Sequence, residues 1–180
     1  MAYWSFDEGK GNIVKDLSGN GNHGVIKGSV EWVKGKWGNA LRFDGISGCV
    51  EIPMNQSLKS PGSLSIEAWI NPTPPYQKGF GGIINNINGA ANRRLLIRES
   101  DNVLYAQLHG PTDGSQTFFG PKIESNKWTH IVYVFTGEEE IWYLNGKEEK
   151  RSFYSEEMPI GDNPMCIGWG FTGPDHYHFR

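Results

Sequence analysis

The sequence has few cysteines, no long apolar run and no excess of basic residues, and each of these absences argues against a class of protein. Two cysteines in 180 residues permit one disulfide at most. No run approaches the about 18 apolar residues of a membrane-spanning helix, and Met1 leads straight into a strand-like Tyr3 to Phe6, so we expect neither a signal peptide nor membrane insertion. With a net charge of −3 and no concentrated basic stripe, the chain offers no surface for nucleic acid.

What is abundant points to β-structure. The chain is 13% aromatic and holds 24 Gly and 10 Pro, a composition that suits strands joined by tight turns. Short or alternating apolar runs bounded by turn residues recur, and none has a helical period. The predicted strands are 40–43, 48–52, 63–70, 81–87, 93–98, 102–109, 127–135, 139–144, 147–153 and 164–169. This spacing predicts one all-β domain over residues 1–180, a sandwich or barrel without βαβ units.

Three segments predict local geometry. Leu144 to Lys147 reads Leu-Asn-Gly-Lys between two strand patterns, which predicts a type I′ hairpin. In 64–70 the apolar residues share one face, and Trp69 lies on the other. In 127–135 both faces are apolar, which is typical of a central strand covered on both sides.

The segment from Asp16 to Gly24 is rich in oxygen-bearing side chains. Asp16, Ser18, Asn20 and Asn22 occupy every second position, and interspersed glycines let the chain curl around a hard cation such as Ca²⁺. An EF-hand is excluded because Lys27 stands where that loop needs a bidentate Glu, and no helices flank it. The alternative is a polar, glycine-rich turn.

The two cysteines, Cys49 and Cys166, both lie within apolar strand patterns. A cysteine in such a position commonly behaves as a small buried hydrophobe. We therefore expect two unpaired thiols rather than a bridge.

Several segments together resemble the laminin G-like members of the concanavalin A-like lectin/glucanase superfamily. In chain order they are 3–11, 16–24, 38–45, 50–53, 64–70, 127–134 and 142–147. The resemblance implies a jelly roll of two antiparallel sheets, often a carbohydrate- or protein-binding module attached to secreted or cell-surface enzymes and adhesins. It also implies a structural Ca²⁺ held by the 16–22 loop.

The chain departs from that family in two places. Members close with a final strand, and this sequence stops at Arg180 where that strand should begin, so we expect the strand to be absent and an edge to be open to pairing with another chain. The acidic cluster of the pentraxin branch is also missing after 165–167, which argues against a phosphocholine site of that kind.

Catalysis of the glucanase type needs two carboxylates about 5 Å apart, such as acids two positions apart on one strand. The Glu-x-Asp-x-x-Glu type of signature that results from this spacing is absent, and the run 138–140 comes closest to it. Glu67 has no second acid beside it, Asp44 belongs to an Asp-Gly hairpin turn, and the run 138–140 fits a solvated turn. We therefore expect that the protein is not an enzyme.

Sugar binding needs aromatic faces with hydrogen-bonding side chains around them. The sequence offers these in two loops, which the resemblance places near each other: 168–178, with Trp169, Phe171, Asp175, His176 and Tyr177, and 85–94, with Asn92, Arg93 and Arg94. Tyr76 is a further candidate. Four other tryptophans, Trp4, Trp37, Trp69 and Trp128, are expected in the core because they fall in strand or strand-edge patterns.

These features predict a non-catalytic module that binds a glycan or polysaccharide, within a longer extracellular or cell-surface protein. The alternative is an adhesion or assembly module with a protein partner, and a glucanase-type glycosidase ranks third. The sequence does not name the ligand.

Overall fold

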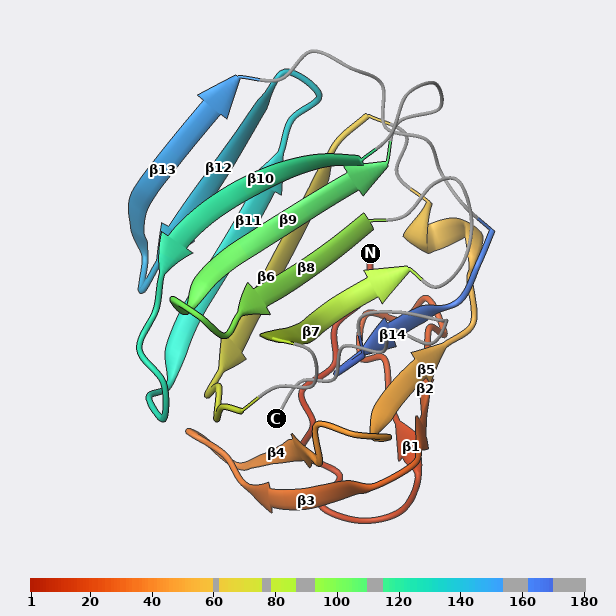
Figure 1. Cartoon of the computed structure of the whole chain (residues 1–180). Helices are drawn as coiled ribbons and strands as arrows, with labels where there is room; N and C mark the ends of the chain where they lie inside the picture. The colour runs from red at the N-terminus through yellow and green to blue at the C-terminus, as the bar shows by residue number, and fades with distance from the viewer. Residues whose placement is uncertain (60–61, 76–78, 87–92, 110–114, 154–161, 170–180) are drawn as a thin grey trace.

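The computed structural model describes residues 1–59, 62–75, 79–86, 93–109, 115–153 and 162–169 (Figure 1). Within these ranges the chain forms fourteen strands and one short 3-10 helix, η1 (Gln56–Leu58). No helix of this described part is long and apolar enough to cross a bilayer. The predicted all-β class is confirmed.

The larger of the two main sheets has eight strands. In order across the sheet they are β1 (Ile13–Val14), β2 (Gly24–Lys27), β5 (Cys49–Ile52), β14 (Met165–Ile167), β7 (Phe80–Asn86), β8 (Arg93–Arg98), β9 (Val103–His109) and β10 (Ser115–Lys122). Each neighbouring pair is antiparallel. Strand β14 pairs with β5 on one side and β7 on the other, so it joins the N-terminal strands to the rest of the sheet.

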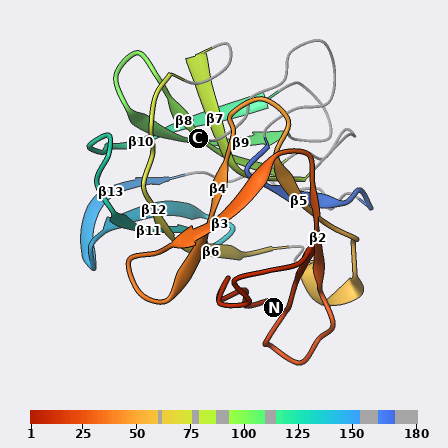
Figure 2. The same ribbon diagram turned by 90° about the horizontal axis from the view of Figure 1, so that it is seen from below.

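The smaller sheet and a two-stranded ribbon complete the fold. The sheet has the order β13 (Lys147–Phe153), β12 (Glu139–Leu144), β11 (Thr129–Phe135) and β6 (Leu64–Ile70), and the ribbon pairs β3 (Val30–Lys34) with β4 (Asn39–Phe43). The two sheets stack as layers, and the ribbon lies below them in Figure 1. Figure 2 shows the ribbon from beneath, crossing in front of β6. This is the predicted two-layer antiparallel jelly roll.

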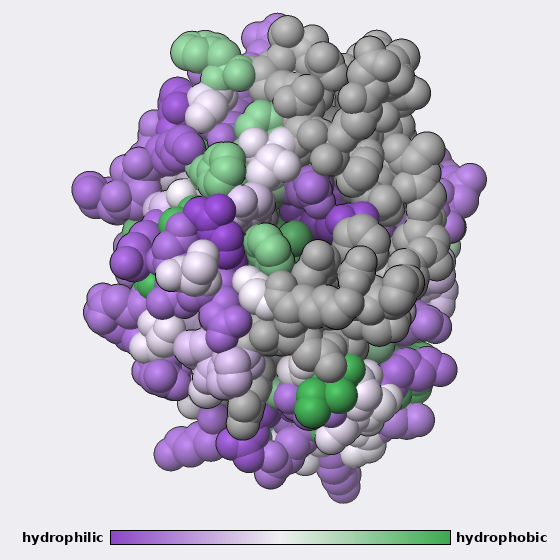
Figure 3. All heavy atoms as spheres, viewed as in Figure 1, coloured by the Kyte–Doolittle hydropathy of each residue, from purple (hydrophilic) through white to green (hydrophobic). Residues whose placement is uncertain are grey.

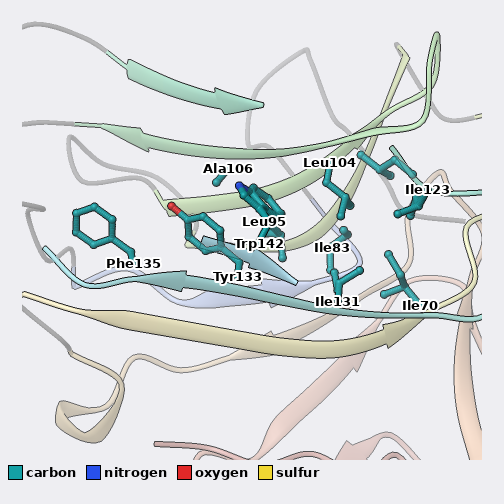
Figure 4. Close-up of a cluster of buried hydrophobic side chains, with 11 residues drawn as sticks. Ile70, Ile83, Leu95, Leu104, Ala106, Ile123, Ile131, Tyr133, Phe135 and Trp142 are labelled. Atoms are coloured by element: carbon teal, nitrogen blue, oxygen red, sulfur yellow. The ribbon is translucent and has the colours of Figure 1, made fainter. Parts of the chain in front are cut away.

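The main core lies between the layers, as Figure 4 shows. Leu95 and Leu104 of the larger sheet face Ile131, Tyr133 and Phe135 of the smaller one, and all five are almost fully buried. Burial of one such side chain stabilises the fold by about 2 kcal/mol. The alternation of buried and half-buried residues along β11 follows from the two-residue period of a strand.

The predicted strand faces are mostly correct. In β6 the apolar residues face the core, while Ser65, Glu67 and Trp69 are exposed on the second face. Strand β11 lies between β12 and β6, as expected of a central strand. Its second face, however, is only half-buried rather than covered, because Val132 and Val134 lie on the side away from the eight-stranded sheet.

Two predicted turns have different outcomes. Asn145 and Gly146 have φ of 50° and 84° between β12 and β13, so the type I′ hairpin is confirmed. Asp44 is a turn residue, but its turn is not a hairpin: β4 pairs with β3, and the next strand, β5, belongs to the other sheet. The Asp44 carboxylate holds this crossover by accepting hydrogen bonds from the backbone N–H groups of 46, 47 and 48.

All ten predicted strands are present, within one or two residues, and four strands were missed. The missed strands are β1, β2, β3 and β10. They are hard to recognise because β1 has two residues, β2 and β3 are broken up by glycine and charged residues, and β10 contains Gly120 and Pro121. Tyr3 to Phe6, which looked strand-like, is irregular, because the Tyr3 N–H donates to the Asp16 side chain instead of a neighbouring strand.

The expectation of a missing last strand concerns chain beyond Trp169, which lies outside the described residues. Among the described strands, the sheet edges are β1 and β10 in the larger layer and β13 and β6 in the smaller. The β13 edge carries five charged residues in succession, 147–151, which disfavours edge-to-edge pairing there.

Gly120 tests the packing between the layers. A Cβ atom at this position would lie 2.9 Å from Cδ2 and Cε2 of Trp142, whose indole is fully buried. Because the indole has no room to move, we expect Gly120→Ala to lower the free energy of unfolding by about 1–3 kcal/mol in chemical denaturation. Gly62→Ala is the control, since nothing lies within 4 Å of its added Cβ. Equal stability of the two variants would contradict this packing.

Asp44 predicts a specific pH dependence. Burial tends to raise the pKa of its carboxyl, but hydrogen bonds from the backbone at 47, 46 and 48 and from the Ser47 hydroxyl outweigh that and lower the pKa from 3.8 to about 2. Because the pKa of Asp44 is lower in the folded state than in the unfolded state, its ionised carboxylate stabilises the fold at pH values above the unfolded-state pKa. This contribution is lost as the pH falls from about 4 to about 2.

The corresponding measurement compares the protein with Asp44→Asn. The difference in unfolding free energy between the two should shrink by about 2 kcal/mol between pH 6 and pH 2. A difference that stays constant over this range would show that the Asp44 charge does not hold the turn.

Candidate functional site

The four residues of the predicted metal loop converge in the structure around the Asp16 carboxylate. Asp16 is buried, and its Oδ1 accepts from the backbone N–H of Tyr3 and of Ser18, each at 2.9 Å. Its Oδ2 accepts from the Ser18 hydroxyl at 2.8 Å and from the Asn22 backbone and amide at 2.9 and 3.0 Å. Burial opposes ionisation, but these five hydrogen bonds dominate and hold the pKa of Asp16 well below its usual range.

The carbonyl oxygen of Met1 lies at the same point. It accepts from the Ser18 hydroxyl at 3.1 Å and from the side-chain amides of Asn20 and Asn22 at 2.9 and 3.2 Å. The loop therefore brings together one carboxylate, one hydroxyl, two amides and a main-chain carbonyl.

This donor set fits Ca²⁺, which takes carboxylate, amide, hydroxyl and carbonyl oxygens. The amide NH₂ groups point inward in this arrangement, and a half-turn of each amide would place carbonyl oxygen there instead. Asn22 tolerates the half-turn, because its Oδ1 accepts from the Ser57 hydroxyl at 3.0 Å and that hydroxyl can equally accept from an amide N–H. Among the described residues, no group of three or more His, Cys, Asp or Glu forms a metal centre, so Asp16 would be the only charged ligand.

Only part of the predicted glycan site can be located. Asn92, Phe171, Asp175, His176 and Tyr177 lie outside the described residues, as does Tyr76. Arg93 and Arg94 belong to the start of β8 rather than to a loop, and Trp169 follows β14 directly. The pairing of Cys166 with Asn85 places β14 beside β7, so Trp169 lies near the β7 end of the second segment, while most of both predicted loops lies outside the described residues.

The two arginines, however, point to opposite faces of the sheet. Arg94 lies opposite Gln107 in the strand register, and its Nη1 donates to Gln107 Oε1 at 3.0 Å. Arg93 is on the other face, where burial lowers the pKa of its guanidinium. Because successive residues of a strand alternate, Arg93 and Arg94 do not serve one site, and their predicted grouping is wrong on this point.

A row of polar side chains crosses the outer face of the eight-stranded sheet. The strand registers place Asn85, Arg94 and Gln107 side by side on this face, next to Cys166. Asn85 and Arg94 are 2% and 8% exposed, so polar groups are built into the sheet surface rather than extended into solvent. We call Asn85, Arg94 and Gln107 the polar row. Figure 3 shows that hydrophilic residues dominate the coloured part of this side of the molecule.

Trp169 lies at the end of the polar row. It is half-buried and packs against Cys49 and Cys166, which are both buried and free. The hydrogen bond with Cys49, together with burial, raises the pKa of the Cys166 thiol. Trp169 is thus neither a core residue nor a fully exposed one.

The sequence interpretation missed an aromatic cluster on the opposite layer. Trp37 and Trp69, both expected in the core, are 65% and 37% exposed, and their rings meet edge to face with centroids 4.7 Å apart. His130 stacks on Trp69 at 5.0 Å, and the Lys36 ammonium lies 4.1 Å from the centre of the Trp69 ring. The prediction failed because, within the described residues, no third layer covers this face of β6. The glycines that flank Trp37, at 35 and 38, are the same signal that marked Trp169 as a surface residue.

The acidic run 138–140 is not the solvated turn that the sequence suggested. Glu140 belongs to β12 and is 1% exposed, with Trp142 Nε1 donating to its carboxylate at 3.3 Å. Burial raises the pKa of Glu140. Glu139 pairs with Arg151, so each of these two acids has a structural partner.

The family model described as the Concanavalin A-like lectin/glucanases superfamily matches residues 44–180. No curated protein sequence matches the chain. Domain 4 of an extracellular arabinanase from Geobacillus stearothermophilus, solved in complex with arabinotriose, superposes with a TM-score of 0.73 at 18% identity, over 99% of this chain and 87% of that one.

Botulinum neurotoxin binding domains are also similar. That of serotype G has a TM-score of 0.70 at 15% identity over 86% of this chain, and that of serotype D has 0.71 at 16% over 95%. The chain covers 40% and 45% of these toxin domains, so it spans less than half of their length. At such identities the likeness concerns the fold alone, and the structural neighbours are binding domains. By its family match, the chain belongs to the concanavalin A-like lectin/glucanase superfamily, in its laminin G-like branch.

Proposed function

We propose that this chain is a non-catalytic glycan-binding module of an extracellular or cell-surface protein, and that its 16–22 loop holds a structural Ca²⁺. The observation that carries the proposal is the polar row with an aromatic ring at one end: Trp169 packs against Cys166, and Asn85, Arg94 and Gln107 follow Cys166 across successive strands of the larger sheet. Hydrogen-bonding groups next to an aromatic ring are what a sugar requires, because its hydroxyls need partners and its C–H face needs an apolar surface.

The likeness to an arabinanase domain solved with arabinotriose supports a saccharide ligand, as the family does. The predicted contacts at Asn92, Phe171, Asp175, His176 and Tyr177 remain part of this proposal, as does Arg94.

A protein ligand is the second candidate, because several similar structures are described as receptor binding domains. The charged β13 edge argues against pairing of this module with a second copy at that edge. Binding to a glycan array in the absence of any protein partner distinguishes the two candidates.

The Ca²⁺ proposal predicts a change in thermal stability. Only the folded loop presents its ligands together, so Ca²⁺ at about 100 times its Kd should stabilise the protein by about 2.7 kcal/mol, seen as a rise in Tm that EDTA reverses. Asn20→Ala removes one exposed ligand without touching the buried Asp16 bonds, and it should reduce the rise while leaving the metal-free Tm nearly unchanged.

Asn12→Ala, an exposed residue outside the loop centre, is the matched control and should keep the full response. If the protein melts at the same temperature in Ca²⁺ and in EDTA, the loop is a hydrogen-bonded turn and nothing more.

The glycan proposal predicts weak binding that depends on Trp169. A shallow site buries little area, so we expect a Kd in about the micromolar to millimolar range, and repetition of modules would have to supply avidity. Trp169→Leu keeps an apolar side chain against Cys49 and Cys166 but loses the aromatic face. We expect at least about a fivefold loss of affinity, since a ring contact is worth about 1 kcal/mol.

The measurement is isothermal titration with the glycan that binds best on an array. Thermal unfolding of the same variant shows whether its fold is intact. Unchanged affinity in a folded Trp169→Leu protein would place the sugar elsewhere.

A further inference from the structure

The exposed pair Trp37 and Trp69 has no role in the sandwich core. Both rings lie outside the layers, and they meet edge to face at an interplanar angle of 89°. An indole that is 65% exposed, as Trp37 is, contributes little to folding by burial. A cluster of exposed aromatic rings on a protein surface is typical of a binding site for a ligand or a partner.

The turn that carries Trp37 is held in place rather than loose. Asp7 Oδ1 accepts from the backbone N–H of Asn39 at 3.0 Å, and the Asn39 amide donates back to the Asp7 carbonyl at 3.2 Å. The backbone N–H of Gly35 donates to the Gly38 carbonyl across the turn at 3.0 Å. The turn therefore holds the Trp37 backbone in a fixed position. This reduces the conformational entropy that the protein loses when a ligand stacks on the ring.

Polar groups surround the pair. The Glu67 carboxylate lies 2.8 Å from Nε2 of His130, which stacks on Trp69, and Glu67 keeps a 70% exposed side chain. Lys34 and Lys36 form no ion pair within the described part of the chain, and Asp7 and Glu67 offset them, so the charges of this surface nearly cancel. This balance fits a neutral ligand with many hydroxyl groups.

A cationic ligand fits less well. The Lys36 ammonium already lies 5.0 Å from the centre of the Trp37 ring and 4.1 Å from that of Trp69. A second cation above these rings would meet its charge at close range.

A cleft of about 630 Å³ continues from Trp69 between the β3–β4 ribbon and the end of β6. Its lining includes Trp128 together with hydrogen-bonding side chains from both elements, among them Arg42, Asn71 and Thr73. A volume of this size lies within the range of sites for small ligands, about 300–1,000 Å³. An aromatic platform that opens into a cleft of mixed polarity suits a chain of two or three sugar units.

We propose that Trp37, Trp69 and the adjoining cleft form a second saccharide site, specific for neutral oligosaccharides. The inference rests on the proposed glycan-binding function but places this site on the opposite layer from the polar row. Two sites on opposite faces would let one module cross-link two polysaccharide chains, and would add avidity where both chains belong to the same insoluble polymer.

The experiment titrates the full chain with a panel of neutral trisaccharides of arabinofuranose, xylose, glucose and mannose, followed by calorimetry and tryptophan fluorescence. For the trisaccharide that binds, we expect Trp37→Ala to lower the affinity of this site at least about fivefold. The parent should bind two ligands per chain, and the variant should bind one in the concentration range where the parent is saturated. The matched control, Phe153→Ala, removes an aromatic residue that is 83% exposed on β13, and it should bind like the parent. Trp37→Phe keeps a ring and should retain part of the affinity, with a smaller ligand-induced blue shift of the emission because Trp69 still emits at the site.

The outcomes separate the two proposals. If the parent binds and Trp37→Ala binds with unchanged affinity and stoichiometry, the second site is wrong while the glycan-binding function stands. If Trp37→Ala loses affinity while Trp169→Leu does not, the second site is supported and the polar row is not the sugar site. If no trisaccharide of the panel and no glycan of the array binds the parent, both proposals are overturned.

Discussion

The pairing of the three-residue strand β14 is the constraint on which the rest of the molecule depends. Met165 to Ile167 lie between β5 and β7, and without them the N-terminal strands β1, β2 and β5 would not be continuous with β7 to β10. Formation of this sheet therefore requires contacts between residues more than a hundred positions apart, such as Cys166 with Glu51. The same pairing sets Cys166 beside Asn85 and carries Trp169 to the end of the polar row.

A second set of long-range hydrogen bonds joins the first residues of the chain to the 16–22 loop. Asp16 gathers N–H donors from Tyr3, Ser18 and Asn22, and the Met1 carbonyl gathers three donors from the same loop. A buried carboxylate is costly unless it is satisfied, so this loop has one well-defined arrangement. The hydrogen bonds and the Ca²⁺ proposal use the same atoms, which is why the loop is ordered by its own bonds and also suited to a cation.

The tryptophans show how one residue type takes different roles in a single sandwich. Trp142 is fully buried between the layers, and Trp169 is half-buried on the outer face of the larger sheet. Trp37 lies on a hydrogen-bonded turn and contacts Trp69. What separates them is the number of layers above each position. A two-layer fold covers only the inner face of each sheet, so an aromatic residue on an outer face either covers other side chains there or remains available to a ligand.

The sequence by itself determined the class of fold, ten of the strands and the Asn145–Gly146 hairpin, because these depend on local alternation and turn chemistry. The family followed from the resemblance of several segments to its members. The sequence also identified the oxygen-rich loop at Asp16, since all its side-chain oxygens lie within seven residues. Only the tertiary structure decided which strands are neighbours, that Glu140 is buried, that Arg93 and Arg94 face opposite sides, and that Trp37 and Trp69 lie outside the core. The physical reason is that an alternating pattern tells which residues share a face but not whether another layer covers that face, and coverage depends on pairings between distant parts of the chain.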